Sequence, residues 1–549
     1  MKKYLILLLC SSALLLESCV DSDGISINNV SSAENLTGLE FTAEERDSLL
    51  DGLTELKTKY EELRELSFPN NITYPLYFIP GPAGTRADNQ SSKIHYSKQE
   101  LKRPEKLEDM AFFSVGQLGE LLRTKQVTSL ELTKMYLERL KRFGSNLECV
   151  VTLTEKRALE QARQADREIA EGLYRGPLHG IPYGAKDLLS ISGYGTTWGA
   201  EPFKDQVIEE TAEVIKRLDR AGAICVAKLT LGALAWGDVW FGGKTRNPWN
   251  LEQGSSGSSA GPAAATAAGL VAFAIGSETW GSIVSPSTRC GVTGFRPSFG
   301  TVSRTGAMAL SWSMDKLGPI CRTVEDCAMV YDVIRGPDHV DLSVMDVPFS
   351  YNPKVDLDKI KIGYIKSAFE DTSTSQNDRD VLSIFAAMGV NLIPLELPEF
   401  PTSALSFVLS AEAAAAFDEL TRSNRDDELV RQIKNAWPNE FRTARFIPAV
   451  EYIQANRARS ILNRRMAALM DQVDVYICPS FWGDNLLRTN LSGHPCVVLP
   501  NGFNAQGSPT SISFIGKLYG EGTLLAAAKV YQDATNWHLQ YPEEFLPHK

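Results

Sequence analysis

Residues 253–286 read QGSSGSSAGPAAATAAGLVAFAIGSETWGSIVSP, and this stretch decides the fold. It contains a Gly/Ser-rich loop at 254–261, an Ala-rich run at 263–268, a strand-like apolar run at 271–275 and a second tight loop at 277–282. Gly/Ser-rich segments are often flexible tethers. Here a helix former and a strand-like run follow at once, so we expect the glycines to let backbone approach other groups closely.

Helix-like and strand-like segments alternate around this stretch. The pattern predicts helices at 154–171, 212–221 and 448–472, and strands at 224–229, 473–480 and 494–500. Such alternation is typical of an α/β fold with a central sheet. No internal repeat is visible, so we predict one large catalytic domain preceded by an N-terminal extension.

The composition excludes some partners. A net charge of −11 argues against a nucleic-acid surface, which needs clustered Lys and Arg. Nine cysteines are present, and none forms a CxxC pair. The seven beyond the N-terminal leader lie scattered in apolar runs, which predicts buried thiols rather than a disulfide framework or a metal site.

The N-terminus carries a processing signal. Lys2 and Lys3 form a basic start, and residues 4–16 are an apolar core too short to cross a bilayer comfortably. Leu16-Glu17-Ser18-Cys19 resembles the end of a bacterial lipoprotein signal, with Glu17 an unusual occupant. We therefore expect an exported protein, lipid-anchored at Cys19 in a bacterial cell envelope on the periplasmic or surface side. A plain secretory peptide is the alternative.

The chain is expected to have three parts. Residues 1–18 are the signal peptide, residues 19–106 a tether with a helical extension, and residues 107–549 the catalytic domain. In the second part, Thr42-Ala43-Glu44-Glu45 is a capping box, and apolar residues recur at helical spacing through Leu66. This pattern predicts one amphipathic helix.

Several hydrolase classes lack their motifs here. The six histidines form no HExxH or HxH motif, and no GxSxG elbow occurs. Serine with lysine remains, because burial lowers the pKa of a lysine and lets it act as a base. Lys186 lies in the apolar passage 181–189 and suits this role. An ion pair with Asp187 is the alternative, although neighbours on a strand point to opposite faces.

Three motifs in this order resemble those of the amidase signature family. They are Lys186-Asp187 after PLHGIP, Gly257-Ser258-Ser259-Ala260-Gly261, and Thr279-Trp280-Gly281-Ser282-Ile283, and GVTGFRP at 291–297 continues the match. The resemblance covers roughly residues 107–537 and is weakest between 340 and 470. It implies a single large α/β domain with a mixed central β-sheet flanked by helices, to which the sequence adds an N-terminal helical extension.

The resemblance also implies roles for individual residues. Ser282 is expected to be the nucleophile, Ser258 the bridging serine on a cis peptide bond, and Lys186 the base. Backbone N–H groups of Thr279, Trp280, Gly281 and Ser282 are expected to form the oxyanion hole. Ser259 supports the loop by hydrogen bonding or is a simple turn serine. No metal and no cofactor is expected.

Two residues depart from the common family pattern Gly-Gly-Ser-Ile-Arg. Trp280 replaces the first glycine; its N–H is kept, and its side chain is a candidate for narrowing or lining the acyl pocket. Val284 replaces the arginine typical of the catalytic chain of tRNA-dependent amidotransferases (the A-type subunit), which weakens a glutaminase function. Five aromatic residues are candidates for an apolar acyl site, with plain core packing as the more common alternative: Trp236, Trp240, Phe241, Trp312 and Trp482.

The expected function is hydrolysis of a carboxylic amide to acid and amine through an acyl-enzyme. Two alternatives stay open: a glutamine-hydrolysing amidotransferase A-type subunit, and a non-catalytic surface-binding lipoprotein. The expected partner is a small-molecule or peptide amide. No nucleic acid is expected, the membrane is reached only through the lipid anchor, and the oligomeric state is left open, with a homodimer among the options.

Overall fold

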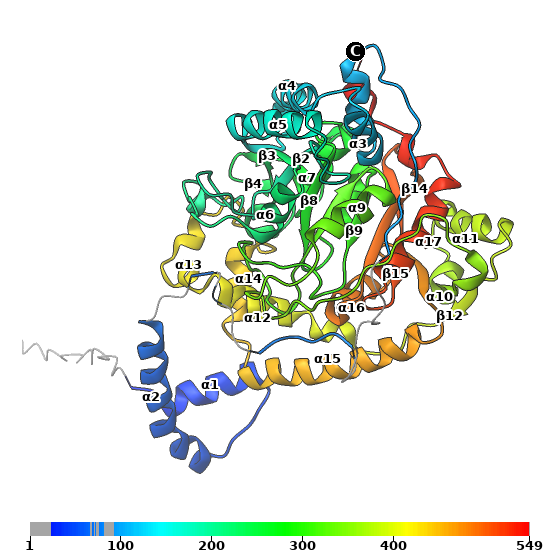
Figure 1. Cartoon of the computed structure of the whole chain (residues 1–549). Helices are drawn as coiled ribbons and strands as arrows, with labels where there is room; N and C mark the ends of the chain where they lie inside the picture. Colours follow the sequence, from blue (N-terminus) through cyan, green and yellow to red (C-terminus); the bar gives the residue numbers. More distant parts are fainter. Residues whose placement is uncertain (1–23, 66–68, 71, 73–75, 82–92, 548–549) are drawn as a thin grey trace, which may run out of the picture. The chain divides into compact units, whose positions relative to one another are not determined.

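The structure is a computed structural model that describes residues 24–65, 69–70, 72, 76–81 and 93–547 (Figure 1). The predicted signal peptide and Cys19 lie outside the described residues. Two compact units are present, residues 1–68 and residues 69–549. None of the helices in the described part of the chain is long and apolar enough to cross a membrane.

The described residues of the N-terminal unit, 24–65, form two helices, α1 (Ile27–Thr37) and α2 (Ala43–Arg64). The predicted capping box begins α2: the Thr42 hydroxyl accepts a hydrogen bond from the Glu45 N–H, and the Glu45 carboxylate accepts one from the Thr42 N–H. An ion pair of 2.7 Å between Arg46 and Glu34 joins the two helices. The helix predicted after Thr42 is therefore present.

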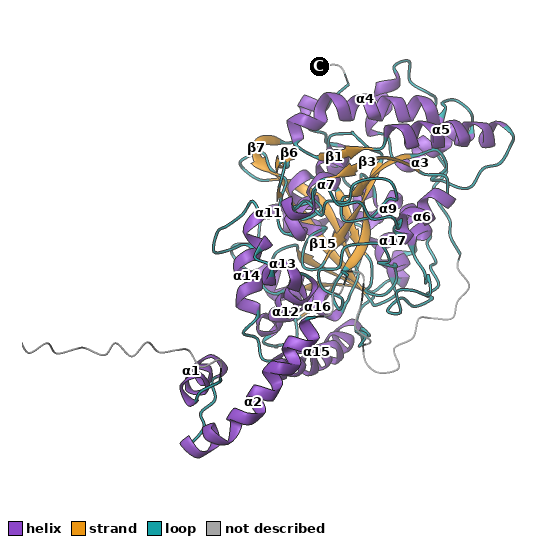
Figure 2. Cartoon of the chain, turned by 90° about the vertical axis from the view of Figure 1, so that its left-hand side faces the viewer, coloured by secondary structure: helices purple, strands orange, loops and turns teal. Residues whose placement is uncertain are grey.

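The larger unit is built on one mixed sheet of eleven strands (Figure 2). Their order is β1-β3-β2-β8-β10-β9-β14-β15-β13-β11-β12. Strands β3, β2 and β8 run parallel, as do β13, β11 and β12, and the other pairs are antiparallel. The strands are β1 (Val150–Leu153), β2 (Pro182–Lys186), β3 (Ile224–Leu229), β8 (Phe273–Glu278), β9 (Thr293–Arg296), β10 (Lys316–Cys321), β11 (Ile362–Ile365), β12 (Ile393–Leu395), β13 (Val475–Pro479), β14 (Cys496–Phe503) and β15 (Pro509–Gly516).

Helices flank this sheet, which confirms the predicted fold class (Figures 1 and 2). Two small hairpins, β4–β5 and β6–β7, stand apart from it. The helices are α3 (Val115–Arg123), α4 (Ser129–Leu147), α5 (Glu155–Ala170), α6 (Glu213–Arg220), α7 (Ala260–Ala267), α8 (Val284–Cys290), α9 (Val324–Ile334), α10 (Lys366–Glu370), α11 (Gln376–Ala387), α12 (Phe407–Ala416), α13 (Asp418–Arg422), α14 (Trp437–Ala444), α15 (Ala449–Met470), α16 (Asn485–Ser492) and α17 (Glu521–Asp533); the hairpin strands are β4 (Val239–Trp240), β5 (Gly243–Lys244), β6 (Arg246–Asn247) and β7 (Asn250–Gly254).

The centre of the sheet is buried on both faces. Every residue of β2, β3 and β8 is buried, as expected for strands that read as nearly continuous apolar runs. Strand β8 differs from the prediction, because it includes Ser277 and Glu278, which were expected in the second loop. Antiparallel pairing with β10 extends the strand to these residues, with Glu278 opposite Lys316.

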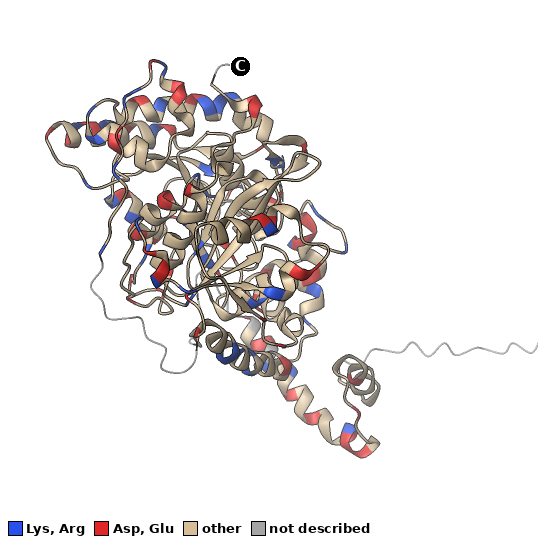
Figure 3. Ribbon diagram, turned by 90° about the vertical axis from the view of Figure 1, so that its right-hand side faces the viewer, with Lys and Arg blue, Asp and Glu red and all other residues tan. Residues whose placement is uncertain are grey.

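The larger unit carries charges of both signs on the face shown in Figure 3, and the thiols of the described chain are buried. On the face of the larger unit shown in Figure 3, basic and acidic residues are interspersed rather than gathered into one basic surface. The seven described cysteines are all buried and free, which confirms the prediction of buried thiols: Cys149, Cys225, Cys290, Cys321, Cys327, Cys478 and Cys496.

Candidate active site

Lys186 is the last residue of β2 and lies beside β8. The two strands are parallel, with Ala185 opposite Ile275, so their carboxyl ends meet at one edge of the sheet. The Lys186 side chain is fully buried. Its Nζ atom lies 2.8 Å from the Ser258 Oγ, 2.9 Å from the Ser277 Oγ and 3.1 Å from the Ser259 Oγ. One amine is therefore surrounded by three hydroxyls.

The surroundings of Lys186 favour the neutral amine. Burial lowers the pKa of Lys186 well below its usual range, and the more distant Asp315 and Glu278 oppose this only in part. Among the described residues, no carboxylate pairs with Lys186. The neighbouring Asp187 instead forms an ion pair of 2.6 Å with Lys228 and accepts two hydrogen bonds from Thr197. The Lys186–Asp187 ion pair considered from the sequence is thus absent.

A proton count assigns the hydrogen bonds of the neutral amine. The Ser259 hydroxyl donates to the Ser277 carbonyl at 3.0 Å and accepts from the Ser277 N–H at 3.1 Å. Because the Ser259 hydroxyl proton already points to the Ser277 carbonyl, the Lys186 amine must be the donor in its hydrogen bond with the Ser259 Oγ. A neutral amine has one further N–H and one lone pair. These remain for Ser258 and Ser277, and the lone pair can accept the Ser258 proton.

Ser258 is held in the Gly/Ser-rich loop between β7 and α7. The Gly257–Ser258 peptide bond is cis. A Cβ atom at Gly257 would collide with the Gly237 carbonyl oxygen, so only glycine fits there. Ser255, Ser258 and Ser259 are buried. Close backbone approach is therefore confirmed, and the flexible-tether alternative is wrong.

Ser282 lies in the loop between β8 and α8. The Ser259 N–H donates a hydrogen bond of 3.1 Å to the Ser282 carbonyl, which ties this loop to the cis peptide. Ser282 is half-buried, and its hydroxyl makes no hydrogen bond with the described residues. Gly281, before it, has a φ of +86°, a conformation that glycine adopts without strain. The structure thus brings the loops of Ser258 and Ser282 together.

The same loop presents free backbone donors. Within the described part of the chain, the N–H groups of residues 279–282 donate no backbone hydrogen bond. The next two N–H groups, of Ile283 and Val284, both donate to the Glu278 carboxylate, at 2.8 and 3.0 Å. The free donors therefore lie where the resemblance implies an oxyanion hole. At Ile283 and Val284, the N–H groups are occupied by the Glu278 carboxylate.

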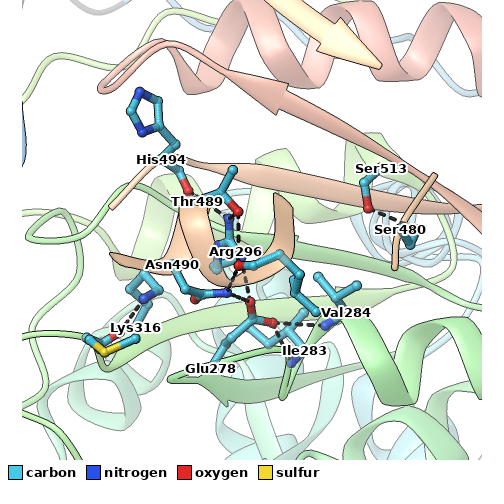
Figure 4. A network of polar contacts seen from close by, with 12 residues as sticks. Glu278, Ile283, Val284, Arg296, Lys316, Ser480, Thr489, Asn490, His494 and Ser513 are labelled. Carbon is cyan, nitrogen blue, oxygen red and sulfur yellow. Dashed lines mark hydrogen bonds and ion pairs between the residues drawn. The ribbon is translucent and has the colours of Figure 1, made fainter. Parts of the chain in front are cut away.

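Glu278 is the centre of a buried polar network (Figure 4). Its carboxylate pairs with Arg296 at 2.6 Å and accepts a hydrogen bond from the Asn490 amide at 2.8 Å. Burial raises the pKa of Glu278, but Arg296 and the N–H donors outweigh this effect and lower it to about 2. Glu278 is thus an ionised anchor that joins the end of β8 to the start of α8 and fixes the loop that carries Ser282.

We expect Glu278→Gln to destabilise the protein by about 3–5 kcal/mol at neutral pH, because it leaves the buried Arg296 guanidinium without its counter-charge. The free energy of unfolding, measured in urea, checks this. The folded-state pKa of about 2 lies below the unfolded value of about 4.3. The carboxylate therefore stabilises fully above about pH 5 and loses its effect as pH falls toward 2.

The difference between Glu278→Gln and the parent protein should accordingly shrink in acid. Glu252→Gln is the matched control, since Glu252 is exposed, and a change within about 0.5 kcal/mol is expected there. Equal unfolding free energies of the parent and Glu278→Gln at pH 7 would contradict the anchoring role.

A pocket of about 890 Å³, including its solvent-filled mouth, opens beside the site. Ser277, whose hydroxyl contacts the Lys186 amine, and Thr279 are among its lining residues. Trp280 is 46% exposed and is not among the described residues that line this pocket. The walls are mainly apolar, and their larger apolar side chains are those of Leu188, Met308, Leu310, Trp312, Leu317 and Val340.

Of the five aromatic candidates, only Trp312 is among the described lining residues of this pocket. Trp236 packs on Trp437, with ring centroids 4.7 Å apart, and Trp240 packs on Phe241. The Trp482 indole donates a hydrogen bond of 3.1 Å to Asp371. These four side chains make structural contacts, the more common role of large aromatic residues.

Sequence reasoning missed Ser277 and the Glu278–Arg296–Asn490 network. A glutamate inside an otherwise apolar strand was a usable signal, because a buried charge requires a partner. Arg296 stood in the quoted GVTGFRP motif, yet nothing local linked it to Glu278. Of the described residues, no group of three His, Cys, Asp or Glu side chains is arranged to hold a metal ion.

Comparison with known proteins identifies the family. The sequence model of the Amidase family matches residues 131–485. The chain belongs to the amidase signature family. This confirms the resemblance seen in the three motifs; the lipoprotein-type detail stays a prediction.

Individual relatives are similar over most of the chain. The A-type subunit of the glutamyl-tRNA(Gln) amidotransferase of Moorella thermoacetica is 30% identical over 79% of this chain and 99% of its own length. Its counterpart of the same name from Roseiflexus castenholzii is 33% identical over 78% and 97%. The solved peptide amidase of Stenotrophomonas maltophilia is 27% identical with a TM-score of 0.68, covering 78% of this chain and 98% of that one.

Proposed function

We propose that the protein hydrolyses carboxylic amides, with Ser282 as nucleophile, Ser258 as proton bridge and Lys186 as general base. The observation that carries this proposal is the buried Lys186 amine, 2.8 Å from the Ser258 hydroxyl and without a carboxylate partner in the described chain. Burial lowers the pKa of Lys186 and so favours the neutral amine, which can accept a proton. Membership of the amidase signature family supports the same chemistry.

The reaction begins with two proton transfers. The Ser258 proton passes to the Lys186 Nζ, and the Ser282 proton passes to the Ser258 Oγ as the Ser282 Oγ bonds to the amide carbon. The carbonyl electron pair moves onto oxygen, where the free N–H groups of residues 279–282 stabilise it. When the C–N bond breaks, the departing nitrogen takes a proton back from Ser258, which Lys186 replenishes.

The second half of the reaction repeats these steps with water. A water molecule gives its proton to the same relay and attacks the ester that Ser282 now carries. The ester C–O bond then breaks, and the proton returns to the Ser282 Oγ. The products are a carboxylic acid and an amine or ammonia, and the relay ends in its starting state.

The pocket supports a substrate with an apolar acyl group. Among the described lining residues, Arg304 is the one cation. Its guanidinium is already paired with Asp341, at 2.8 and 3.1 Å, and it also donates to the Trp312 carbonyl. The Asp315 carboxylate likewise already accepts hydrogen bonds, from the Thr279 hydroxyl and from the N–H groups of Leu310 and Ser311. A substrate carboxylate would therefore compete with Asp341 for Arg304, whereas an apolar chain meets a matching wall.

A second candidate is a glutamine-hydrolysing amidotransferase A-type subunit. The observation that favours it is the name carried by the curated relatives, which are 30–33% identical over 78–79% of the chain. Val284, at the position where that subunit typically has arginine, and the pairing of Arg304 weigh against it. Ammonia delivery to a partner protein would accompany this activity.

A panel of substrates separates the two candidates. The purified protein without residues 1–18 is incubated with primary amides, N-acyl anilides of rising chain length, peptide amides and glutamine. We expect kcat/KM for apolar acyl amides to exceed that for glutamine at least tenfold. A preference for glutamine would support the amidotransferase function, and no hydrolysis of any member would contradict both.

We also propose export and lipidation at Cys19, supported by Lys2, Lys3 and the apolar residues 4–16. Mass spectrometry of the mature N-terminus tests this: a lipidated Cys19 is expected, and an intact Met1 would contradict it.

A further inference from the structure

Asn70 forms a paired contact with the wall of the pocket. It precedes both the family match at 131–485 and the predicted catalytic domain at 107–549. Its amide nitrogen donates a hydrogen bond of 3.0 Å to the Ala309 carbonyl, and its amide oxygen accepts one of 2.7 Å from the Ala309 N–H. Both backbone groups of Ala309 are therefore satisfied by one side chain, as they would be by a neighbouring strand.

Ala309 belongs to the pocket-lining 308–312 loop. Its neighbours in this loop form hydrogen bonds with Leu188 and Asp315. The Met308 N–H donates to the Leu188 carbonyl at 3.0 Å. On the other side, the Leu310 and Ser311 N–H groups donate to the Asp315 carboxylate at 2.8 and 2.9 Å. Among the described residues, Asn70 is the partner of the Ala309 backbone. Without Asn70, the Ala309 backbone would have no partner among the described residues, whereas Met308 and Leu310 on either side would keep theirs.

The fixed part of this loop is connected to the active site. The carboxylate of Asp315 that holds Leu310 also accepts a hydrogen bond of 2.5 Å from the Thr279 hydroxyl. Thr279 lines the pocket and directly precedes Trp280, Gly281 and Ser282, whose N–H groups are free within the described chain. Asn70 and Ala309 line the same pocket and are connected to Thr279 through Leu310 and Asp315. An acyl group that extends to the 308–312 loop therefore meets the part of the wall that Asn70 holds.

We propose that Asn70 is a positioning residue that fixes the part of the acyl-pocket wall formed by the 308–312 loop and so sets the selectivity for long apolar acyl groups. This inference rests on the proposed amidase function. Short acyl groups contact Ser277 and Thr279, whereas long ones also pack on the 308–312 loop. The segment before the family match thus takes part in substrate selection.

The test compares Asn70→Ala, Asn70→Asp and Ile72→Ser with the parent protein. Acyl anilides from acetyl to decanoyl are the substrates. We expect Asn70→Ala to lower the ratio of kcat/KM for decanoyl over acetyl about tenfold, through KM rather than kcat. Asn70→Asp should lower it too, because a carboxylate oxygen would face the Ala309 carbonyl. Ile72→Ser, two residues away on an exposed side chain, should keep the parental ratio.

Two results would overturn the proposal: an unchanged ratio in Asn70→Ala, or an equal loss for short and long acyl groups. If the parent protein hydrolyses no amide, the proposed function fails, and hydrogen–deuterium exchange then decides on Asn70. Faster exchange of the peptide covering 307–312 in Asn70→Ala, but not in Ile72→Ser, supports the positioning role. Equal exchange in all variants overturns it.

Discussion

Ser282→Ala is expected to lower kcat/KM for amide substrates by about 10⁴-fold or more, because loss of the nucleophile in a serine hydrolase removes the covalent route altogether. Residual rate would come only from the free N–H groups of residues 279–282 and from substrate binding. The Ser282 hydroxyl makes no hydrogen bond with the described residues, so the unfolding free energy should stay within about 0.5 kcal/mol of the parental value.

Covalent labelling isolates this role from substrate preference. A small fluorophosphonate probe should label the parent protein and fail to label Ser282→Ala. Ser285→Ala is the matched control, since Ser285 follows in the same polypeptide segment at the start of α8. Labelling of Ser282→Ala at the parental rate would show that another residue is the nucleophile.

Local patterns sufficed to predict much of the fold. Strand β3 has the predicted bounds, 224–229, because an apolar run between turn residues is strand-like in any context. Helix α6 and helix α15 differ from their predicted bounds by one or two residues at each end. Helix caps and strand ends depend on the final hydrogen bonds, which explains these small differences.

Non-local contacts were beyond sequence reasoning. Strand β8 ends at Glu278 because β10 pairs with it, although residues 277–282 look like one loop. The Glu278 anchor depends on Asn490, which is 212 residues away in the sequence. The hydrogen bonds of Asn70 to Ala309 span 239 residues. In each case the sequence contains both partners but no local sign that they meet.

The motifs predicted which residues gather around Lys186, but not all their roles. Ser258 and Ser259 both contact the Lys186 amine, as a supporting role for Ser259 would require. Ser277 makes a third contact that was not expected. The catalytic roles of Lys186, Ser258 and Ser282 remain predictions that the substitutions test.

Lys186→Met is expected to lower kcat by about 10²–10⁴-fold, the usual contribution of a positioned general base. Lys228→Met is the matched control for stability. Both lysines are fully buried, but Lys228 pairs with Asp187 at 2.6 Å. Removing Lys228 leaves a buried carboxylate unpaired and should cost about 3–5 kcal/mol. Removing Lys186 leaves no unpaired carboxylate. The two substitutions should therefore change the free energy of unfolding in opposite directions.

The direction of the stability change in Lys186→Met follows from the lowered pKa of Lys186. Burial lowers the folded-state pKa of Lys186 well below the unfolded value of about 10.4, so keeping this lysine neutral at pH 7 costs free energy. The three hydrogen bonds that the substitution removes are worth about 1 kcal/mol each. We expect the cost of deprotonation to exceed their value, so that Lys186→Met is more stable than the parent protein at pH 7.

The gain should depend on pH in a defined direction. Between the folded and unfolded pKa values of Lys186, the unfolded parent protein binds one more proton, so parental stability rises as pH rises toward about 10.4. The advantage of Lys186→Met should accordingly shrink and then reverse as pH rises toward about 10.4, where the lost hydrogen bonds outweigh the remaining cost of deprotonation. Urea unfolding at pH 6, 7, 8, 9 and 10 measures this crossing. A stability difference between Lys186→Met and the parent protein that does not change from pH 6 to pH 10 would contradict a lysine that is neutral in the folded protein, and a charged lysine cannot serve as the base.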